Sequence, residues 1–193
     1  MAILAAIFSQ WPGRGRWRRG LAVLALLGGV AGARAAAPTA EYQVKAAFLF
    51  NFAQFVDWPA MAYADEKAPL VIGVIGPDPF GAYLDGLVQG EKIDGHPIVV
   101  RRFAEGEKLE CHMLFVSAAT AGRMDRIRAQ LIGQPVLTVG DTDNFSRLGG
   151  LVRFVTEQGK IHLRINAAAA KASGLTISSK LLRWATIVTA DKD

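Results

Sequence analysis

The spacing of apolar residues predicts a long helix between residues 41 and 58. Apolar positions recur there every three or four residues, and Pro59, which cannot continue a helix, closes the segment. The apolar stripe consists of Val44, Phe48, Phe52, Phe55 and Val56. Such a stripe gives the helix one face to pack against the core of a globular domain.

Two polar side chains interrupt this stripe. On a helical wheel, Lys45 and Asn51 fall inside the arc of apolar residues. A buried polar group needs a partner, so each is either satisfied inside the fold, which we favour, or faces a ligand pocket. Phe50 projects on the polar side and is exposed unless this chain, a second subunit or a partner covers it. We name these three residues, together with Trp58 at the helix end, as candidate contacts for a partner or ligand.

Continuous apolar runs follow the helix and alternate with helical patterns. A short apolar run bounded by turn residues is typical of a strand covered on both faces, as in a parallel sheet. After the first run, Asp78 can cap a helix and Pro79 can occupy its first turn. The predicted strands cover residues 70–75, 98–102, 112–116 and 136–139, and the predicted helices cover residues 79–88 and 121–132.

The last third of the chain predicts an antiparallel hairpin. Residues 151–156 and 160–165 flank Gln158 and Gly159, a tight-turn signal in which glycine can take a positive φ. With the preceding elements, the hairpin predicts one layered α/β domain whose mixed, mostly parallel sheet is flanked by helices.

The residues after the hairpin predict a short helix and then an ambiguous segment. A helix over residues 166–173 stops at Gly174, a good left-handed cap, and residues 175–188 fit a helix or a strand. Within that segment a Ser-Ser-Lys sequence can cap and start a helix, contact an anion, or form part of a partner surface, with capping favoured. Its members are Ser178, Ser179 and Lys180.

Composition excludes several classes of protein. The chain has 193 residues, 51% of them hydrophobic, and a single cysteine, Cys111, which excludes a disordered protein and a disulfide scaffold. The formal charge of +5 comes from 22 basic and 17 acidic residues, but five arginines and no acidic residue precede residue 36. Without those arginines the body is neutral, which argues against a protein that binds the phosphate backbone of nucleic acid.

The first 35 residues have the pattern of a secretory signal peptide. Arginines precede the apolar run 21–30, and Ala33, Arg34 and Ala35 fit a signal-peptidase site. The run is too short for a bilayer core, which needs roughly 20 apolar residues. We therefore expect a signal peptide over residues 1–35 and a soluble exported domain over residues 36–193.

The sequence carries no recognisable catalytic or metal-binding motif. His96, His112 and His162 have no Cys or His three or four positions away, and nucleophile-elbow, phosphate-loop and dinucleotide signatures are missing. Asp141 and Asp143 lie in a loop without the glutamate that an EF-hand requires, so we interpret the loop as a turn. We expect neither an enzyme nor a bound metal or cofactor.

Several blocks of residues resemble, in the right order, those of the YfiR-like periplasmic family. The first block is YQVKAAFLFNF at 42–52 with FVDWP at 55–59. The later blocks are PLVIGVIG at 69–76, DPFG at 78–81, CHMLFVS at 111–117, PVLTV at 135–139, GG at 149–150 and SSKLLR at 178–183. The resemblance covers essentially residues 41–188, although no block is a catalytic motif.

This resemblance implies a regulator that acts by contact in the periplasm. Its best-known member binds the periplasmic sensor region of a membrane diguanylate cyclase, represses cyclic di-GMP synthesis and thereby limits biofilm formation, and such proteins are also dimers. That member has disulfides, whereas Cys111 has no partner cysteine in this chain.

Two readings of the function follow. In the first, the aromatic helix and the Ser-Ser-Lys segment contact the sensor region of an inner-membrane signalling protein. In the second, the protein is a periplasmic small-ligand sensor in which Lys45, Asn51 and Arg153 line a polar pocket.

Overall fold

A computed structural model describes residues 37–190. The signal peptide predicted over residues 1–35 lies outside these residues. The helices are α1 (Ala40–Phe55), α2 (Ala82–Val88), α3 (Met124–Leu131), α4 (Ala167–Ala172) and α5 (Ser179–Leu182), with 3-10 helices η1 (Ala60–Ala62) and η2 (Ala118–Arg123). The strands are β1 (Val56–Asp57), β2 (Leu70–Ile75), β3 (Lys92–Ile93), β4 (His96–Phe103), β5 (Met113–Val116), β6 (Leu137–Gly140), β7 (Val152–Glu157), β8 (Lys160–Ile165), β9 (Thr176–Ile177) and β10 (Ala185–Ile187).

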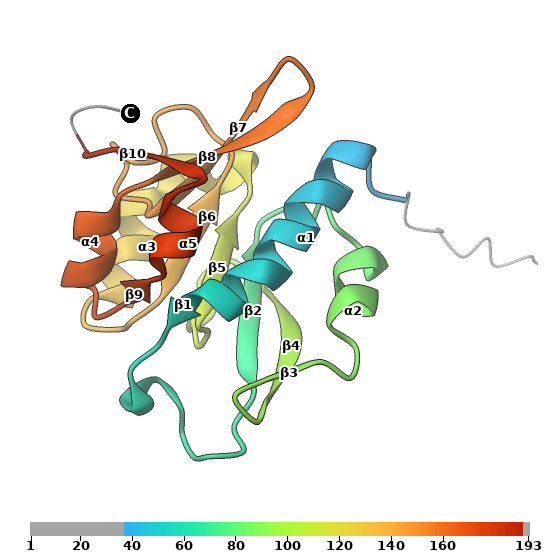
Figure 1. Cartoon of the computed structure of the whole chain (residues 1–193), viewed down its shortest axis with the longest axis vertical. Coiled ribbons are helices and arrows are strands. Elements are labelled where there is room, and N and C mark those ends of the chain that lie inside the picture. Colours follow the sequence, from blue (N-terminus) through green and yellow to red (C-terminus); the bar gives the residue numbers. More distant parts are fainter. Residues whose placement is uncertain (1–36, 191–193) are drawn as a thin grey trace, which may run out of the picture. The chain divides into compact units, whose positions relative to one another are not determined.

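The main sheet confirms the predicted mixed α/β fold (Figure 1). Its eight strands have the order β10-β8-β7-β6-β5-β2-β4-β3. The pairs from β4 through β2, β5 and β6 to β7 are parallel, as is β8 with β10, whereas β7 with β8 and β3 with β4 are antiparallel. The predicted hairpin is therefore present, but it lies inside the sheet because β10 pairs beyond it. Strands β1 and β9 form a separate antiparallel pair.

Side chains alternate between two apolar layers on the faces of the sheet. On β2, Ile72 and Val74 enter the layer beneath α1 and α2, whereas Ile75 enters the layer beneath α3. The same alternation on β5 sends Phe115 to the first layer and Val116 to the second. Both faces of the central strands are thus covered, which explains their continuous apolar sequences.

Helix α1 confirms the predicted helix but turns a different face to the core. It begins after the cap Thr39 and ends at Phe55, three residues before the predicted end, because Val56 leaves for strand β1. Val44 is 46% exposed, and Asn51 is also exposed, so the wheel misplaced both. The buried residues of the helix are Lys45, Ala46, Leu49, Phe52 and Ala53.

The helix predicted after β2 begins later than expected. Asp78 accepts a hydrogen bond from the Phe80 backbone N–H at 2.8 Å, which forms a tight turn, and α2 starts only at Ala82. Arg102 on β4 holds this turn through Asp78 at 2.9 Å and Asp85 at 2.6 Å. The predicted helix 121–132 is also divided, because its first turns belong to η2 and only the rest to α3.

The ambiguous C-terminal segment contains both kinds of element. Its pieces β9, α5 and β10 are each two to four residues long. Ser178 caps α5 by accepting a hydrogen bond from the Lys180 backbone N–H at 3.3 Å, as the favoured interpretation predicted. Elements this short carry too few residues for a periodicity to be detected.

The loop between β6 and β7 is anchored by Phe145, whose side chain is fully buried. Two glycines make room for this ring. A Cβ on Gly140 would stand 2.6 Å from Phe145, and one on Gly150 would stand closer still. The loop that follows β6 is therefore held in place by side-chain packing.

Candidate functional site

A buried ion pair joins α1 to the loop after β6. Lys45 Nζ lies 2.6 Å from Asp141 Oδ2 and 2.7 Å from Glu41 Oε1. Only 3% of the Lys45 side chain and 6% of the Asp141 side chain are exposed. The lysine that interrupts the apolar stripe is thus satisfied inside the fold, as we favoured.

Tyr42 and Glu41 complete this cluster on the first turns of α1. The Tyr42 hydroxyl donates to Asp141 Oδ2 at 3.0 Å, and Lys45 Nζ stands 4.5 Å from the centre of the Tyr42 ring. Burial, together with the charge of Asp141, raises the pKa of Tyr42 to about 12. The hydrogen bond from Lys45, followed by one from Thr156, lowers the pKa of Glu41 below its usual range. At neutral pH Glu41 is therefore ionised and the Tyr42 phenol is protonated.

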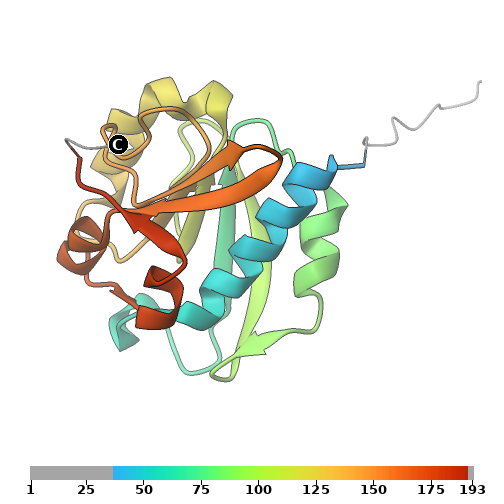
Figure 2. The same cartoon turned by 45° about the horizontal axis from the view of Figure 1, so that its top comes forward.

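A pocket of about 310 Å³ opens beside this cluster. Its lining adds Arg153 on β7, which is 8% exposed and pairs with Asp143. Ala118, two residues after the end of β5, lines it too. The β7–β8 hairpin reaches over toward α1, where the Thr156 hydroxyl donates to Glu41 at 2.8 Å (Figure 2).

This pocket lies at the edge of the sheet at which open α/β sheets bind ligands, the carboxyl ends of the parallel strands. The chain leaves β2 through α2 to reach β4 on one side, and it leaves β5 through α3 to reach β6 on the other, so the direction of the connections changes between β2 and β5. The pocket is next to that point, between β5 and β6. Asp141 directly follows the end of β6, and Ala118 lies two residues after the end of β5.

The structure brings together only some of the candidate residues. Lys45 and Arg153 line one pocket, as the small-ligand reading expected, whereas Asn51 lies on the exposed side of α1. Phe50 is half-buried and packs against the main core. The Trp58 indole N–H donates to the His112 carbonyl at 3.0 Å, which gives Trp58 a structural role. Glu41, Tyr42 and Asp141 were missed, because no spacing connects residues that lie about a hundred positions apart.

An apolar groove of about 630 Å³ separates α1 from the C-terminal segment. Its floor is aromatic and aliphatic, and it combines the aromatic helix with the segment that contains Lys180. The apolar lining residues are Phe48, Phe52, Phe55, Ile161, Leu163 and Leu181. The two segments that the sequence singled out for partner contact therefore border one groove, although Lys180 alone of the candidate contact residues is in its described lining.

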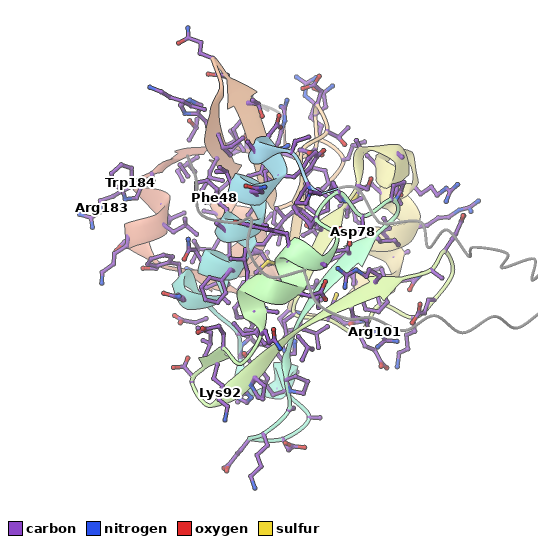
Figure 3. All side chains as sticks on the ribbon, turned by 90° about the vertical axis from the view of Figure 1, so that its right-hand side faces the viewer. Phe48, Asp78, Lys92, Arg101, Arg183 and Trp184 are labelled. Atoms are coloured by element: carbon purple, nitrogen blue, oxygen red, sulfur yellow. The ribbon has the colours of Figure 1, made fainter. Side chains whose placement is uncertain are left out.

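The rim of this groove is basic and carries a large exposed aromatic side chain. Trp184 is 85% exposed. Figure 3 shows it next to Arg183, on the same side of the domain as Phe48. The other charged lining residues are Lys160 and Lys180, and no carboxylate from residues 37–190 lines the groove. Ser178 and Ser179 lie next to it, at the cap and first residue of α5.

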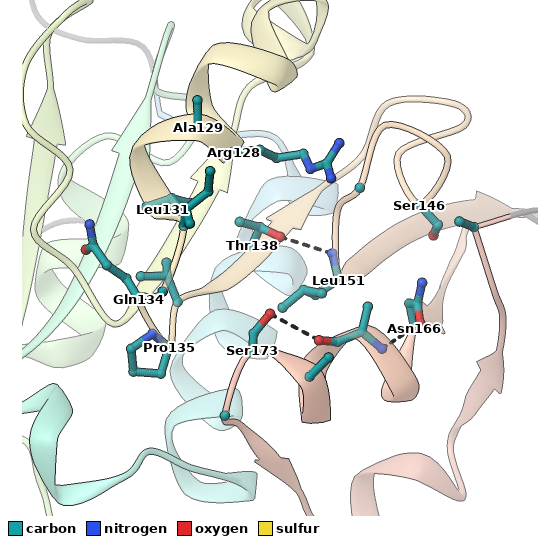
Figure 4. A pocket seen from close by; sticks show the side chains of 18 of the residues that line it. Arg128, Ala129, Leu131, Gln134, Pro135, Thr138, Ser146, Leu151, Asn166 and Ser173 are labelled. Atoms are coloured by element: carbon teal, nitrogen blue, oxygen red, sulfur yellow. Dashed lines mark hydrogen bonds between the residues drawn. The ribbon is translucent and has the colours of Figure 1, made fainter.

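A third pocket, of about 840 Å³, lies between α3 and α4 (Figure 4). Its polar groups serve the fold. Thr138 accepts a hydrogen bond from the Leu151 N–H at 3.0 Å, Ser173 donates to the Ala169 carbonyl, and Asn166 caps α4. This pocket offers a ligand few polar groups that are not already used.

Two histidines contact the Tyr63 ring at the amino ends of β4 and β5, the edge of the sheet opposite to the charged pocket. The Tyr63 ring stacks on His96 with centroids 3.8 Å apart and on His112 at 4.5 Å. The Val71 backbone N–H donates to His112 Nδ1 at 3.1 Å, so that nitrogen must be unprotonated. Burial, followed by the nearby charge of His96, lowers the pKa of His112 below its ordinary value, although the Ala62 carbonyl opposes this.

We expect the protein to lose stability as the pH falls from 7 to 5. The unfolded chain protonates His112 near its ordinary pKa of 6.5, whereas the folded chain does so only at lower pH. Protons therefore favour the unfolded state, with a slope of at most about 1.4 kcal/mol per pH unit from this residue. Urea unfolding of the wild type and of His112→Asn, which offers Val71 an amide oxygen, measures the effect. An equally steep pH dependence in both proteins would contradict the assignment.

The remaining chemistry is sparse among residues 37–190. Burial raises the pKa of the Cys111 thiol to about 12, so it is an inert thiol at neutral pH. In this part of the chain no group of three or more His, Cys, Asp or Glu side chains could hold a metal ion. Nor does any helix of this part have the length and apolar character needed to cross a bilayer.

A family model described as YfiR/HmsC-like matches residues 42–186. No curated protein matches the chain.

Proposed function

The chain belongs to the YfiR/HmsC-like family, and from this membership we propose that it is an exported regulator of diguanylate cyclase signalling. It is expected to bind the periplasmic sensor region of an inner-membrane signalling protein. By this contact it represses a diguanylate cyclase and so lowers cyclic di-GMP and biofilm formation. The signal peptide expected over residues 1–35 supports a periplasmic location, on the same side of the membrane as such a sensor region.

The observation that carries this proposal is the groove between α1 and α5. Phe48 and Phe55 remain half-buried in it, and Trp184 stands 85% exposed at its rim. Exposed aromatic side chains next to an apolar depression are typical of the energetically dominant part of a protein interface. The groove is thus suited to the contact by which the family regulates.

The charge of the rim indicates the chemistry of the partner. Lys160, Lys180 and Arg183 surround the groove, and no carboxylate in the lining balances them. A complementary partner segment presents apolar side chains to the floor and acidic side chains to the rim. We expect that segment in the sensor region of the membrane protein.

Trp184→Ala is expected to weaken this association by about 30-fold or more. An interface residue of this kind contributes at least about 2 kcal/mol, and every 1.4 kcal/mol is tenfold in Kd. Because Trp184 is largely exposed, the variant should fold normally. The matched control is Ile132→Ala, which removes an 81% exposed apolar side chain that does not line the groove.

The measurement has two parts. Tagged wild type is used to recover partners from solubilised envelope, and mass spectrometry should identify a membrane protein with a diguanylate cyclase domain. In cells that lack the chromosomal copy, wild type and Ile132→Ala should lower cyclic di-GMP, whereas Trp184→Ala should not. Repression by Trp184→Ala equal to that by wild type would exclude the groove as the contact. Unchanged cyclic di-GMP with every protein would refute the proposed function.

A further inference from the structure

The pocket at the carboxyl ends of β5 and β6 contains a buried carboxylate oxygen without a hydrogen-bond partner, Asp141 Oδ1, and an excess of negative charge. We propose that it binds a small organic cation through a primary ammonium group. This site shares no lining residue with the groove, so the inference is independent of the proposed partner.

The charged groups of the pocket leave one negative charge in excess. Three carboxylates, Glu41, Asp141 and Asp143, line it together with two cations, Lys45 and Arg153. Both cations are already engaged, Lys45 by Glu41 and Asp141, and Arg153 by Asp143. An anionic ligand would have to compete with these carboxylates, whereas a cation would complete the charge balance.

The hydrogen bonds of the pocket point to the same class of ligand. Asp141 Oδ2 accepts from both Lys45 and Tyr42, but its Oδ1 is buried and has no hydrogen-bond partner. Since buried polar atoms are nearly always paired, Asp141 Oδ1 is an acceptor that a donor group of a ligand can satisfy. An ammonium group supplies donors and positive charge together.

The size and position of the pocket limit the ligand. A volume of about 310 Å³ lies at the lower end of the range for small-molecule sites. A short diamine fits that volume, and its second ammonium group can meet Glu41 or Asp143, which are 41% and 89% exposed at the mouth. Entry to Asp141 Oδ1 requires these mouth side chains to move aside, and their exposure allows it.

The test is titration calorimetry of the purified protein with putrescine, supported by the shift in Tm. Tetramethylammonium is the matched probe, because it carries a positive charge but no N–H donor. We expect saturable binding of putrescine, a higher Tm in its presence, and no comparable effect of tetramethylammonium. Absence of saturable putrescine binding, or equal binding of tetramethylammonium, would overturn the proposal.

Three variants locate the binding. Asp141→Asn should weaken putrescine binding at least tenfold, and Glu41→Gln, a change at a partly exposed residue, should weaken it severalfold. Asp85→Asn removes a carboxylate that pairs with Arg102 outside the pocket, and it should leave binding unchanged. Where Asp141→Asn does not fold, Glu41→Gln decides, and binding as tight as in the wild type would reject the site.

Discussion

Asp141→Ala is expected to lower the free energy of unfolding by about 3 kcal/mol, because it leaves the buried Lys45 ammonium with a single, partly exposed carboxylate. The Tyr42 hydroxyl loses its acceptor in the same variant. Removal of one partner from a buried pair is far more damaging than loss of a surface pair, since the remaining charge has no water to solvate it. Urea unfolding followed by circular dichroism measures the difference.

A surface pair of the same chemistry is the control. Asp85→Ala breaks a 2.6 Å contact with Arg102, but the two side chains are 45% and 40% exposed, so the loss should stay within about 1 kcal/mol. The double variant Lys45→Met with Asp141→Asn removes both charges and should recover much of the stability lost in Asp141→Ala. Equal destabilisation by Asp85→Ala and Asp141→Ala would show that burial of the Lys45 pair has little energetic importance.

The second large effect is expected from Gly150→Ala. The added methyl group would overlap the ring of Phe145, which is fully enclosed and cannot move away without displacing its neighbours. Overpacking of this kind destabilises by about 2–3 kcal/mol. The melting temperature and the urea midpoint of the variant should both fall.

Gly86→Ala provides the comparison within the same protein. Gly86 lies inside α2, and a Cβ there would meet no atom within 4 Å. Alanine is the better helix former by about 1 kcal/mol, so this variant should be as stable as the wild type or more stable. A loss in Gly86→Ala as large as that in Gly150→Ala would mean that the effect is not one of packing around Phe145.

Local sequence was sufficient for the longer strands of the sheet, although the short β3 and β10 were not predicted. Strand β2 has the predicted bounds, because an apolar run covered on both faces is confined by Pro69 and Gly76. The turn at Gln158 and Gly159 was equally local, and both residues have a positive φ, of 51° and 74°. Such features depend on neighbours in sequence, which is why periodicity and turn residues predict them.

The face of α1 that enters the core could not be read from the helix alone. α1 is apolar around most of its circumference, and it contacts the sheet, α2 and the hairpin region. The wheel therefore placed Val44 and Asn51 inside, although the three-dimensional neighbours leave both exposed. A helix with several packing partners has no single stripe that a wheel can identify.

The cluster of Glu41, Tyr42, Lys45 and Asp141 could not be predicted from the sequence for a different reason. Lys45 was recognised as an anomaly in an apolar helix, and Asp141 was interpreted as part of a turn. Their contact depends on the order of strands, which brings the end of β6 beneath the first turns of α1. Only the topology makes them neighbours. The groove depends in the same way on the packing of α5 beside α1, which no local pattern predicts.

The place of α1 in the chain has a consequence for biosynthesis. This helix is made before every strand that it covers, and its last contacts, with Leu163 of β8 and Leu181 of α5, are made more than a hundred residues later. The apolar helix α1 therefore leaves a ribosome or an export channel before the strand and helix that cover it have been made. Chains that stop before β8 leave Phe48 and Phe52 uncovered on that side, and we expect such intermediates to be prone to aggregation. The helix that lines the groove of the folded protein is thus a segment that exposes apolar side chains during synthesis.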